Sequence, residues 1–501
     1  MRLVFEITSR VNWTMTPSSQ NPKEVALQEI ESRLEREPGA IELQVERARL
    51  LIDLTRLDEA KDIYLGILTR EPTHLIALNN LAAVLNMMGY YEAALKVYRE
   101  VVKLEPDNLK ARMNFADSLR DSAELKEARS QYEILLQKDP GNKNAHRGMS
   151  YVLSYLGEKE AAWTHHRKAG GNRAAASIPA RKSGEEQPIP VLLLASPCGG
   201  NTPMAQLLDK KIFRALKLVP DFYDPAQPLP PHRFVLNAIG DADHCATALE
   251  AAQMIVERSG APVLNFPARV LVTGRVENSR LLGALEGVVT PRIAALSRAT
   301  LAGPNAAAVL EDKGFTFPLL LRTPGFHGGS HFLRVANKDA LAQAVETLPG
   351  ERLLAIEYLD ARDDDGKIRK YRVMMIGGKL YPLHKAVSPD WMIHYYSAEM
   401  AHSAEHRAED AAFLEDLPGV VGERAMGALA RIQEALGLDY AGADFSLDRN
   451  GEVLLFEANA TMVTPLPDKG EKWDYRRAPV QKIRAAVQEM FLAKAKAGQP
   501  V

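Results

Sequence analysis

A period of 34 residues in the first third of the chain constrains its fold more than any other feature. Three consecutive segments, 41–74, 75–108 and 109–142, align without a gap. Each carries two spaced alanines, a tyrosine four residues after the second alanine, and a proline near its end: Ala48, Ala60, Tyr64 and Pro72; Ala82, Ala94, Tyr98 and Pro106; Ala116, Ala128, Tyr132 and Pro140. Such a period is typical of supersecondary units that stack on their neighbours.

The residue types at these positions favour pairs of antiparallel helices. Alanine lets two helices approach closely, tyrosine fills the groove towards the next unit, and proline stops the second helix. The pattern resembles the tetratricopeptide repeat, which implies an all-α solenoid over residues 21–169. A half-unit before the three segments and a partial unit after them are expected to act as caps.

The same resemblance implies a concave face that binds a peptide or a protein. The side chains expected there are Arg49, Asn79, Asn80, Lys110 and Asn114. A rigid spacer or a dimerisation arm is the alternative interpretation of the solenoid.

Length and charge exclude several classes of function. A chain of 501 residues predicts two to four domains. Its 62 basic and 64 acidic residues give a net charge of −2, so there is no electrostatic argument for a nucleic-acid or membrane partner. The two cysteines, Cys198 and Cys245, provide neither a disulfide framework nor a zinc site, which fits a reducing cytoplasm. Residues 1–20 lack the pattern of a secretory signal, and no oligomeric state follows from composition.

The composition changes after the repeats. Residues 170–189 are small, polar and proline-bearing, which predicts a linker. From residue 190 we expect strands that alternate with helices over 203–217 and 243–258, and therefore a small parallel α/β layer over residues 190–267. Ligands collect at the carboxyl ends of such strands. Those ends carry Ser196, Cys198, Asn201, Asp241, Asp243 and Asn265.

An apolar hairpin near the C-terminus ends in a carboxylate and an amide. Asn450-Gly451 favours a two-residue type I′ turn, which would place Asp444 directly opposite Glu457. Because side chains alternate faces along a strand, Asp444, Glu457 and Asn459 would share one face. Opposed carboxylates repel each other unless a cation lies between them, and such oxygen ligands suit Mg²⁺. An ordinary solvated hairpin is the alternative.

Glycines and basic residues lie on the segments before this hairpin. A leucine-rich strand ends at Arg322, and the next loop contains glycines whose backbone N–H groups could wrap phosphates. Further strands are expected over 353–358, 369–376 and 379–386. Alternation places Lys370 and Arg372 on one face, and Arg372 and Lys385 are expected to point towards the Asp444–Glu457 patch.

In order along the chain, these segments resemble an ATP-grasp protein, nearest in pattern to glutathione-synthetase-like enzymes and ribosomal-protein glutamate ligases. The series runs through VLNFP, NSRLL…GVVTPR, the glycine loop, IEYLD, YRV, HK and EAN, over about residues 190–495. The resemblance implies an α+β ATP-grasp domain over 268–497, with residues 190–267 as the preceding small α/β domain. Two subdomains would then clasp ATP between antiparallel sheets.

The resemblance also implies roles for individual residues. Asp444, Glu457 and Asn459 would bind Mg²⁺, with Mn²⁺ as a substitute. The adenine hinge would be Glu357 with Tyr358 and Leu359. The phosphate contacts would be Arg280, Arg322, Gly328, Gly329, Arg372 and Lys385, of which Arg372 and Lys385 would be the catalytic cations. Arg280 and Arg322 stand where the family usually has lysine, and arginine needs a wider, planar contact.

The implied activity is ATP-dependent formation of an amide. A substrate carboxylate attacks the γ-phosphate to give an acylphosphate and ADP, and an amine then displaces phosphate. The repeats would recruit the peptide or protein that takes part. Two alternatives remain: a non-catalytic nucleotide-binding scaffold, and a small-molecule kinase on the same fold. Trp391, His394, Tyr395 and Tyr396 are candidates for substrate contact, with packing as their ordinary role.

Overall fold

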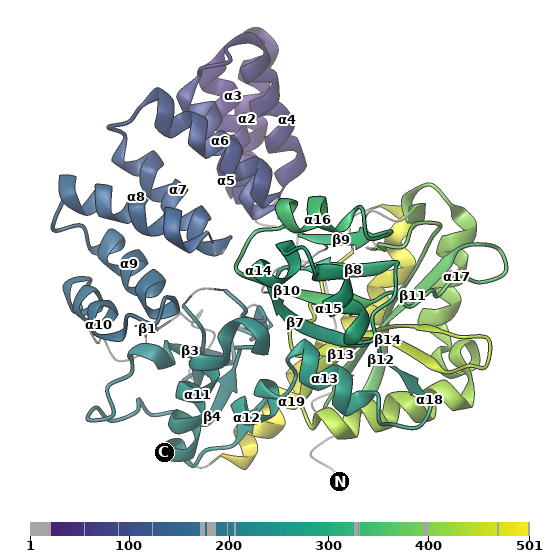
Figure 1. Cartoon of the computed structure of the whole chain (residues 1–501). Helices are drawn as coiled ribbons and strands as arrows, with labels where there is room; N and C mark the ends of the chain where they lie inside the picture. Colours follow the sequence, from purple (N-terminus) through teal and green to yellow (C-terminus); the bar gives the residue numbers. More distant parts are fainter. Residues whose placement is uncertain are drawn as a thin grey trace, which may run out of the picture. The chain divides into compact units, whose positions relative to one another are not determined.

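A computed structural model gives the arrangement of the chain (Figure 1). It describes residues 22–498 except 55, 89, 123, 171–175, 178–186, 198, 205–206, 325–328, 330, 394–398 and 468–469. The predicted segment 1–20 therefore lies outside the described residues. The chain divides into two compact units, Met1–Ala169 and Gly170–Val501.

In its described residues, the first unit is a stack of helix pairs that follows helix α2. Helices α3, α5, α7 and α9 begin at 34-residue intervals, and so do their partners α4, α6, α8 and α10. The bounds are α2 (Pro22–Arg36), α3 (Ile41–Asp53), α4 (Leu57–Arg70), α5 (Leu75–Met87), α6 (Tyr91–Leu104), α7 (Leu109–Asp121), α8 (Leu125–Lys138), α9 (Lys143–Tyr155) and α10 (Lys159–Lys168). The predicted solenoid is confirmed, but the segment expected to be a partial cap forms a complete pair, α9 and α10.

Local chemistry explains where these helices begin and end. Glu71, Glu105 and Asp139 follow the second helix of a pair and have ψ values of 83°, 80° and 85°. Each precedes a proline, whose ring excludes the helical conformation from the residue before it. At the start of α7, the Asn108 side chain accepts a hydrogen bond from Ala111 N (2.9 Å), and Asn142 caps α9 in the same way.

The repeated alanines and tyrosines form the core of the stack. Ala116, Ala128 and Tyr132 are fully buried. A Cβ atom added to Gly148 of α9 would overlap the ring of Tyr132 of α8. The tyrosine therefore fills the groove to the next helix pair, as its repeated position predicts.

The second unit begins with a five-stranded sheet in the order β1-β3-β2-β4-β5. Its strands are β1 (Ala176–Ser177), β2 (Ile189–Leu194), β3 (Phe213–Leu218), β4 (Phe234–Asn237) and β5 (Val263–Leu264), and all but β1 are parallel. Two expectations are wrong here. Part of the predicted linker forms β1, and the predicted helix 203–217 contains β3, because Phe213, Ala215 and Leu218 are buried in the sheet.

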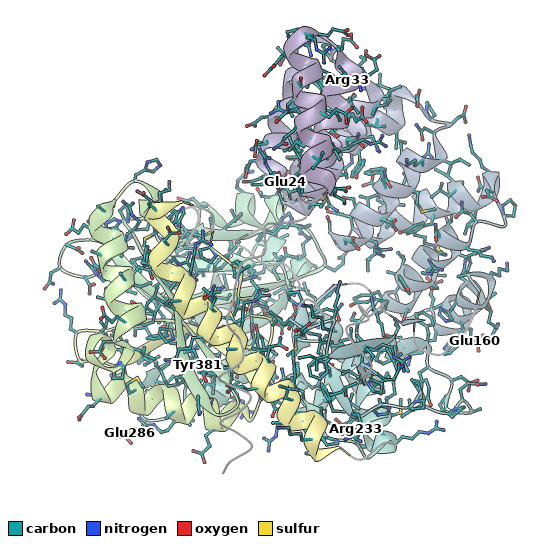
Figure 2. The ribbon with its side chains drawn as sticks, turned by 180° about the vertical axis from the view of Figure 1, so that it is seen from behind. Glu24, Arg33, Glu160, Arg233, Glu286 and Tyr381 are labelled. Atoms are coloured by element: carbon teal, nitrogen blue, oxygen red, sulfur yellow. The ribbon has the colours of Figure 1, made fainter. Side chains whose placement is uncertain are left out.

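The predicted helix near 243–258 is α11 (Ala242–Ser259), which packs on one face of this sheet. The other face contacts the C-terminal helix α19 (Arg477–Ala497) through Phe213, Phe234 and Phe491. Figure 2 shows α19 from behind, with Tyr381 beside it. No helix of the described residues is long and apolar enough to span a bilayer.

The second sheet is antiparallel, with the order β7-β10-β8-β9. Its strands are β7 (Ile293–Ser297), β8 (Leu319–Arg322), β9 (Phe332–Val335) and β10 (Arg352–Glu357). One face buries Leu319, Leu321 and Leu353 against short helices between residues 298 and 347: α14 (Arg298–Ala302), α15 (Ala306–Asp312) and α16 (Leu341–Thr347). The opposite face carries Leu320, Leu354 and Ile356.

The third sheet has the order β12-β11-β13-β14-β6, in which only β6 runs parallel to its neighbour. Its strands are β6 (Val288–Val289), β11 (Ile368–Ile376), β12 (Lys379–Ser388), β13 (Tyr440–Leu447) and β14 (Val453–Asn459). Helices α17 (Ala404–Glu415) and α18 (Leu417–Leu436) cover one face of it, where Tyr371, Val373 and Met375 lie. On the other face, Met374 and Ile376 pack on α19, while Lys370 and Arg372 line a cavity.

The β13–β14 hairpin departs twice from a regular ladder. Asp448 N donates to Glu452 O, so the loop has three residues, 449–451, and not the predicted two. A bulge then occurs between Asp444 and Phe445, where Phe456 is the extra residue on β14. The two departures offset each other, and Asp444 lies directly opposite Glu457, as predicted.

Candidate functional site

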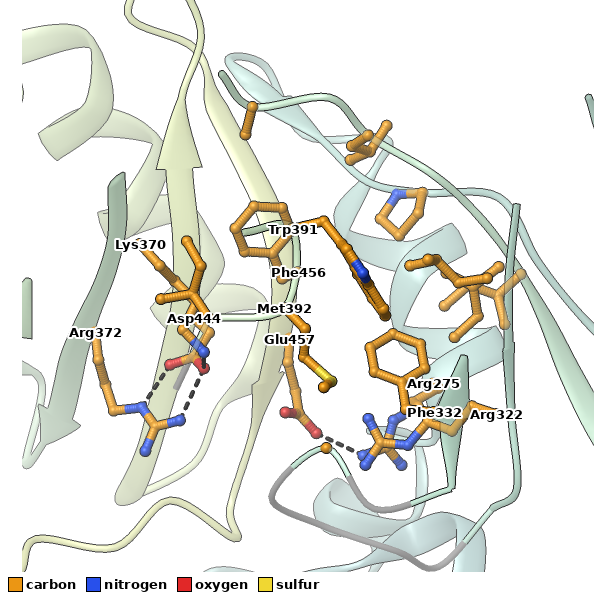
Figure 3. A pocket seen from close by; sticks show the side chains of 18 of the residues that line it. Arg275, Arg322, Phe332, Lys370, Arg372, Trp391, Met392, Asp444, Phe456 and Glu457 are labelled. Carbon is orange, nitrogen blue, oxygen red and sulfur yellow. Dashed lines mark hydrogen bonds and ion pairs between the residues drawn. The ribbon is translucent and has the colours of Figure 1, made fainter. Parts of the chain in front are cut away.

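A cavity of about 500 Å³ lies between the second and third sheets. Figure 3 shows its lining, with Phe332 and Arg322 on one wall and Arg372 and Asp444 on the other. The size is that of a small-molecule or cofactor site, for which about 300–1,000 Å³ is usual. Its two ends differ in polarity.

The apolar end consists of residues from both sheets and from the segment after β12. The residues there are Ile293, Leu320, Phe332, Ile356, Ile368, Trp391, Met392, Ile393 and Phe456. The rings of Trp391 and Phe332 meet edge to face, with centroids 5.3 Å apart. A flat, apolar ligand would find aromatic and aliphatic walls at this end.

The predicted hinge lies at the rim of the apolar end. Glu357, Tyr358 and Leu359 all line the cavity. The Glu357 carboxylate accepts a hydrogen bond from Arg292 N (2.9 Å), while Glu357 N donates to Arg292 O. The carboxylate and the backbone N–H of Glu357 therefore both bind Arg292, which joins β10 to the segment before β7. The carboxylate thus already has a hydrogen-bond partner.

At the polar end, Asp444 is held by two cations of β11. Lys370 Nζ lies 3.0 Å from Asp444 Oδ2, and Arg372 Nη2 lies 2.7 Å from the same oxygen. Burial opposes ionisation of this carboxyl, but attraction to Arg372 and Lys370 outweighs it, and the pKa of Asp444 lies well below its ordinary value. Asp444 is therefore a carboxylate at any physiological pH.

Glu457 has a different partner, Arg275 at the start of helix α13 (Arg275–Leu282). Arg275 Nη2 donates to Glu457 Oε1 at 2.6 Å, and Arg275 Nη1 donates to Asp243 Oδ2 at 2.8 Å. Burial lowers the pKa of Arg275, but attraction to Glu457 and Asp243 raises it by a larger amount. The pKa of Arg275 therefore lies above its ordinary value. Arg275 thus joins α11 to β14 through a charged bridge.

Arg322 lies at the same end, where attraction to Glu457, Asp241 and Asp243 offsets only part of what disfavours its charge. Burial, together with repulsion from Arg275, lowers its pKa to about 10. Its guanidinium carbon lies 5.3 Å from the centre of the Phe332 ring. An anion beside these two guanidinium groups would offset the repulsion between them.

Asn459 presents its amide nitrogen, not its oxygen, to Glu457. Asn459 Nδ2 donates to Glu457 Oε1 (2.9 Å), while Asn459 Oδ1 accepts from Thr461 N (2.9 Å). The residue lines a smaller cavity of about 30 Å³ beside the main one, together with Arg275 and Glu457.

The donor set fits a magnesium ion in part. Asp444 and Glu457 are opposed carboxylates at the cavity, and one or two carboxylates are the protein ligands that Mg²⁺ usually has. Asn459 would fit only after its amide turned towards them. In the described part of the chain, no group of three or more His, Cys, Asp or Glu side chains could hold a metal ion.

Two predicted cations do not reach the cavity. Arg280 is exposed on α13 and is not among the residues that line it. Lys385 is buried behind the sheet, where its Nζ lies 2.6 Å from Glu409 Oε2. The reason is an irregularity in the β11–β12 ladder between Arg372 and Val373, which pairs Arg372 with His384 and Lys385 with Tyr371. Lys385 therefore shares the face of Tyr371, away from Arg372.

The remaining predicted residues divide as follows. The cavity is lined by Gly329, Arg322, Arg372, Glu357, Tyr358, Leu359, Asp444 and Glu457. Gly328, His394, Tyr395, Tyr396 and Cys198 lie outside the described residues. Asn201 lines the cavity from the loop after β2, and Asp243 contacts it only through Arg275.

Sequence reasoning missed Arg275 and did not assign Lys370 to the site. For Lys370 the signal was present, because strand alternation already placed it on the face of Arg372. Arg275 carries a weaker signal, a glycine at its N-terminal side at the start of a short helix. Nothing in that pattern distinguishes Arg275 from Arg280.

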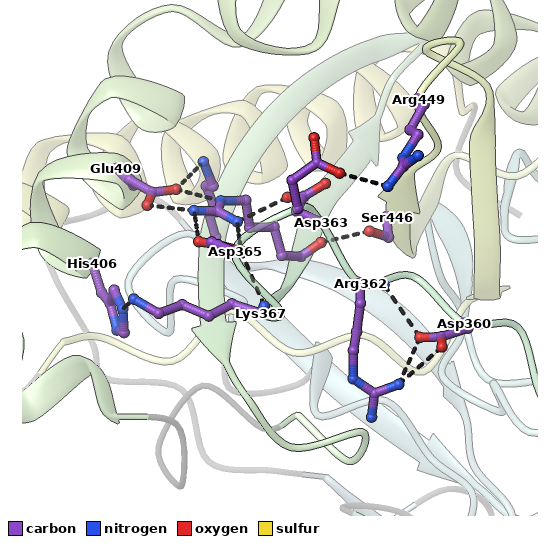
Figure 4. Close-up of polar contacts among 12 residues, drawn as sticks. Asp360, Arg362, Asp363, Asp365, Lys367, His406, Glu409, Ser446 and Arg449 are labelled. Carbon is purple, nitrogen blue, oxygen red and sulfur yellow. Dashed lines mark hydrogen bonds and ion pairs between the residues drawn. The ribbon is translucent and has the colours of Figure 1, made fainter.

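Behind the third sheet, an ion network fixes α17 (Figure 4). Glu409 accepts from Arg369 Nε at 2.9 Å and pairs with Lys385. Arg369 also binds Asp363 and Asp365 of the loop before β11. Burial raises the pKa of Glu409, but hydrogen bonds from Arg369 and Lys385 outweigh it and bring this pKa to about 2.

Comparison with known proteins concerns the first unit. A sequence model of the tetratricopeptide repeat matches residues 86–162. No curated protein matches the chain. Solved structures that are similar include YrrB, described as a TPR protein with an unusual peptide-binding site (24% identity; 29% of this chain, 76% of that chain; TM-score 0.27). Another is MamA from Desulfovibrio magneticus RS-1 (20% identity; 30% of this chain, 84% of that chain; TM-score 0.28).

The N-terminal unit therefore contains tetratricopeptide repeats, an architecture that indicates a protein-interaction scaffold. It precedes a mixed α/β unit of three sheets.

Proposed function

We propose that the second unit is an ATP-dependent carboxylate–amine ligase of the ATP-grasp type, and that the repeats recruit a peptide or protein that takes part in the reaction. One observation carries the proposal. A cavity between two sheets has apolar walls and the residues Glu357, Tyr358 and Leu359 at one end, and at the other end cations around two opposed carboxylates.

The balance of charge at the polar end supports a polyanionic ligand. Arg275, Arg322, Lys370 and Arg372 line the cavity, and the carboxylates at this end are Asp444 and Glu457. The excess positive charge lies on largely buried side chains, where electrostatic interactions are stronger than at the surface. A triphosphate would neutralise it, and would also offset the burial and the repulsion from Arg275 that lower the pKa of Arg322.

In this proposal Asp444 and Glu457 hold Mg²⁺, or Mn²⁺ in its place, which when bound neutralises charge on the phosphates. The side chains of the protein position the ligands and neutralise their charge. Arg372 and Lys370 keep Asp444 ionised, Arg275 orients Glu457, and the aromatic walls exclude water from the apolar end. An acylphosphate would form from the acid substrate, and an amine would complete the amide bond.

Equilibrium binding and product analysis test the proposal together. We expect the full chain to bind a non-hydrolysable ATP analogue more tightly with Mg²⁺ than without it. We expect ADP release only when both a carboxylic acid and an amine are supplied from a panel. Glu457→Gln should abolish the effect of Mg²⁺, while Glu452→Gln, on the same hairpin but outside the cavity, should not.

A non-catalytic nucleotide-binding scaffold is the second candidate, and one observation favours it. Each carboxylate already has a cationic partner from the chain, so neither Asp444 nor Glu457 requires a metal ion to balance its charge. Nucleotide binding that is indifferent to Mg²⁺, with no ADP release on any pair of substrates, would establish this candidate in place of the ligase.

A further inference from the structure

Two histidines meet inside the last helix pair of the first unit. His146 of α9 and His165 of α10 face each other through their Nδ1 atoms, 2.9 Å apart, and His146 Nε2 lies 3.0 Å from Pro140 O. His146 is 4% exposed. The ring centroids are 4.9 Å apart. This polar contact joins the two helices at a buried point.

The preceding repeat uses a different pair at the same place. Arg112 and Gln131 stand 34 residues before His146 and His165. Arg112 Nη1 donates to Gln131 Oε1 at 2.5 Å, and Arg112 Nη2 donates to Pro106 O at 2.8 Å. The two repeats therefore share one arrangement: a side chain of the first helix donates to the proline carbonyl and also contacts a side chain of the second helix. Neither Arg112 nor Gln131 changes charge near neutral pH, whereas imidazole is the side chain whose ordinary pKa lies near neutral.

The contacts define which ring nitrogens carry protons. A carbonyl oxygen only accepts, so His146 Nε2 must carry a hydrogen. In the neutral ring, His146 Nδ1 is then an acceptor, and His165 Nδ1 must donate to it. If one proton is added at His146 Nδ1, the contact can persist only when His165 moves its own proton to Nε2 and accepts through Nδ1, and a charge is then partly buried. If both rings are protonated, two N–H groups face each other and the contact is lost.

The surroundings disfavour the charged forms. Burial, repulsion from His146, and repulsion from Lys168 of the same helix all lower the pKa of His165. On the α8 side, the nearby carboxylate Asp139 is engaged by Gly141 N and Asn142 Nδ2. On the α7 side, Arg120 lies over the Tyr151 ring of α9 and pairs with Asp117 and Asp121.

The sign of the pH effect follows. The folded-state pKa of His165 lies below the ordinary value of about 6.5, so the unfolded chain takes up the proton first. The stabilisation is fully present above that value and is lost as the pH falls below it.

We propose that the His146–His165 pair makes the last helix pair of the solenoid a proton-sensitive joint, in which α10 detaches from α9 in mild acid. The preceding helix pair, α7 and α8, lacks this sensitivity because Arg112 and Gln131 take the place of the histidines. Detachment uncovers the side of α9 that α10 covers, so the end of the repeat stack would change with pH while the preceding pairs stay folded.

Hydrogen exchange of the full chain tests the joint, with a control that the chain itself supplies. Corrected protection of α10 should stay constant between about pH 7.5 and about pH 6.5, and below about pH 6.5 it should fall by up to about tenfold per pH unit for each extra proton bound on opening. Protection of α8 should stay unchanged. The double variant H146R/H165Q copies the Arg112–Gln131 pair and should remove the pH dependence. Equal losses in wild type and double variant, or no loss in wild type, would overturn the proposal.

A second measurement does not depend on the double variant folding. Nitrogen-15 shifts of the imidazole rings at neutral pH should show a proton on Nε2 of His146 and on Nδ1 of His165. The opposite assignment would refute the geometry. The single variant H165Q keeps a donor opposite His146 and should show a weaker pH dependence than wild type. A pH dependence equal to or larger than that of wild type would count against the joint.

Discussion

Asp444 lies directly opposite Glu457 across the β13–β14 ladder, yet the two carboxylates are held by different cations. The bulge at Phe456 produces this arrangement. Leu455 and Ala458 face the core under α18, while Phe456 and Glu457, adjacent in sequence, both line the cavity. One extra residue therefore supplies an apolar wall and a carboxylate at neighbouring points of the same site.

The first prediction concerns the buried charge of Asp444. Asp444→Asn leaves Lys370 and Arg372 partly buried without a counter-charge, and we expect a loss of about 3–5 kcal/mol in the free energy of unfolding of the second unit. Urea denaturation of the full chain would measure it. Asp364→Asn breaks the exposed pair with Arg449 and should cost less than about 1 kcal/mol. Similar costs for both variants would contradict the assignment of Asp444 to a buried network.

The second prediction separates Arg275 from Arg280. Five residues along an α-helix correspond to a rotation of about 140°, so the two side chains cannot face the same site. Arg275→Gln should weaken binding of a non-hydrolysable ATP analogue at least about tenfold, as expected for loss of about 1.4 kcal/mol or more from charge-assisted hydrogen bonds. Arg280→Gln should change it less than about twofold by the same relation. Calorimetric titration would measure the affinity of both variants for the analogue. A larger loss of affinity in Arg280→Gln than in Arg275→Gln would support the original prediction that Arg280 contacts phosphate.

The repeats were predictable because their signal is local and repeated. The three predicted segments share one pattern of alanine, tyrosine and proline, and the helices from α3 to α8 begin and end at the same positions within each segment. Glu357 and Arg322 were also predictable as cavity residues, since each is a polar residue at the end of an apolar strand.

Irregularities in strand pairing were not predictable, and they decide the faces of side chains. Counting from the Gly377-Gly378 turn places Lys385 on the face of Arg372, but the extra residue Leu383 reverses it. At β13–β14, the longer loop and the bulge each shift the register by one, so the correct pairing of Asp444 with Glu457 depended on two compensating departures. Packing between distant segments determines such bulges, and a single sequence carries little trace of it.

The third prediction concerns acid stability of the network behind the third sheet. The pKa of Glu409, about 2, lies below its ordinary value of 4.5. Its stabilisation is therefore fully present above about pH 4.5 and is lost as the pH falls towards about 2. Glu409→Gln should lower the free energy of unfolding by about 1–3 kcal/mol near pH 7, and the difference from wild type should shrink across that window.

Denaturation series between pH 7 and pH 2 would test the third prediction. Glu415→Gln, an exposed change on the same helix, should behave as wild type throughout. A difference between Glu409→Gln and wild type that stays constant with pH would show that Glu409 acts through packing and not through its charge.

The fourth prediction tests the groove between the last two helix pairs. Tyr132 is fully buried, and its hydroxyl is held by Asp117 (2.5 Å) and Arg120 (3.2 Å), so the ring cannot move aside for a methyl group on Gly148. Gly148→Ala should cost about 1–3 kcal/mol through overpacking. Gly66→Ala, in open space on α4, should instead stabilise by about 0.5–1 kcal/mol, because alanine favours a helix.

Hydrogen exchange should show reduced protection in α8 and α9 for the first variant and increased protection in α4 for the second. Unchanged protection at α8 and α9 would mean that the tyrosine does not fill the groove, and the stacking derived from the 34-residue period would lose its main contact.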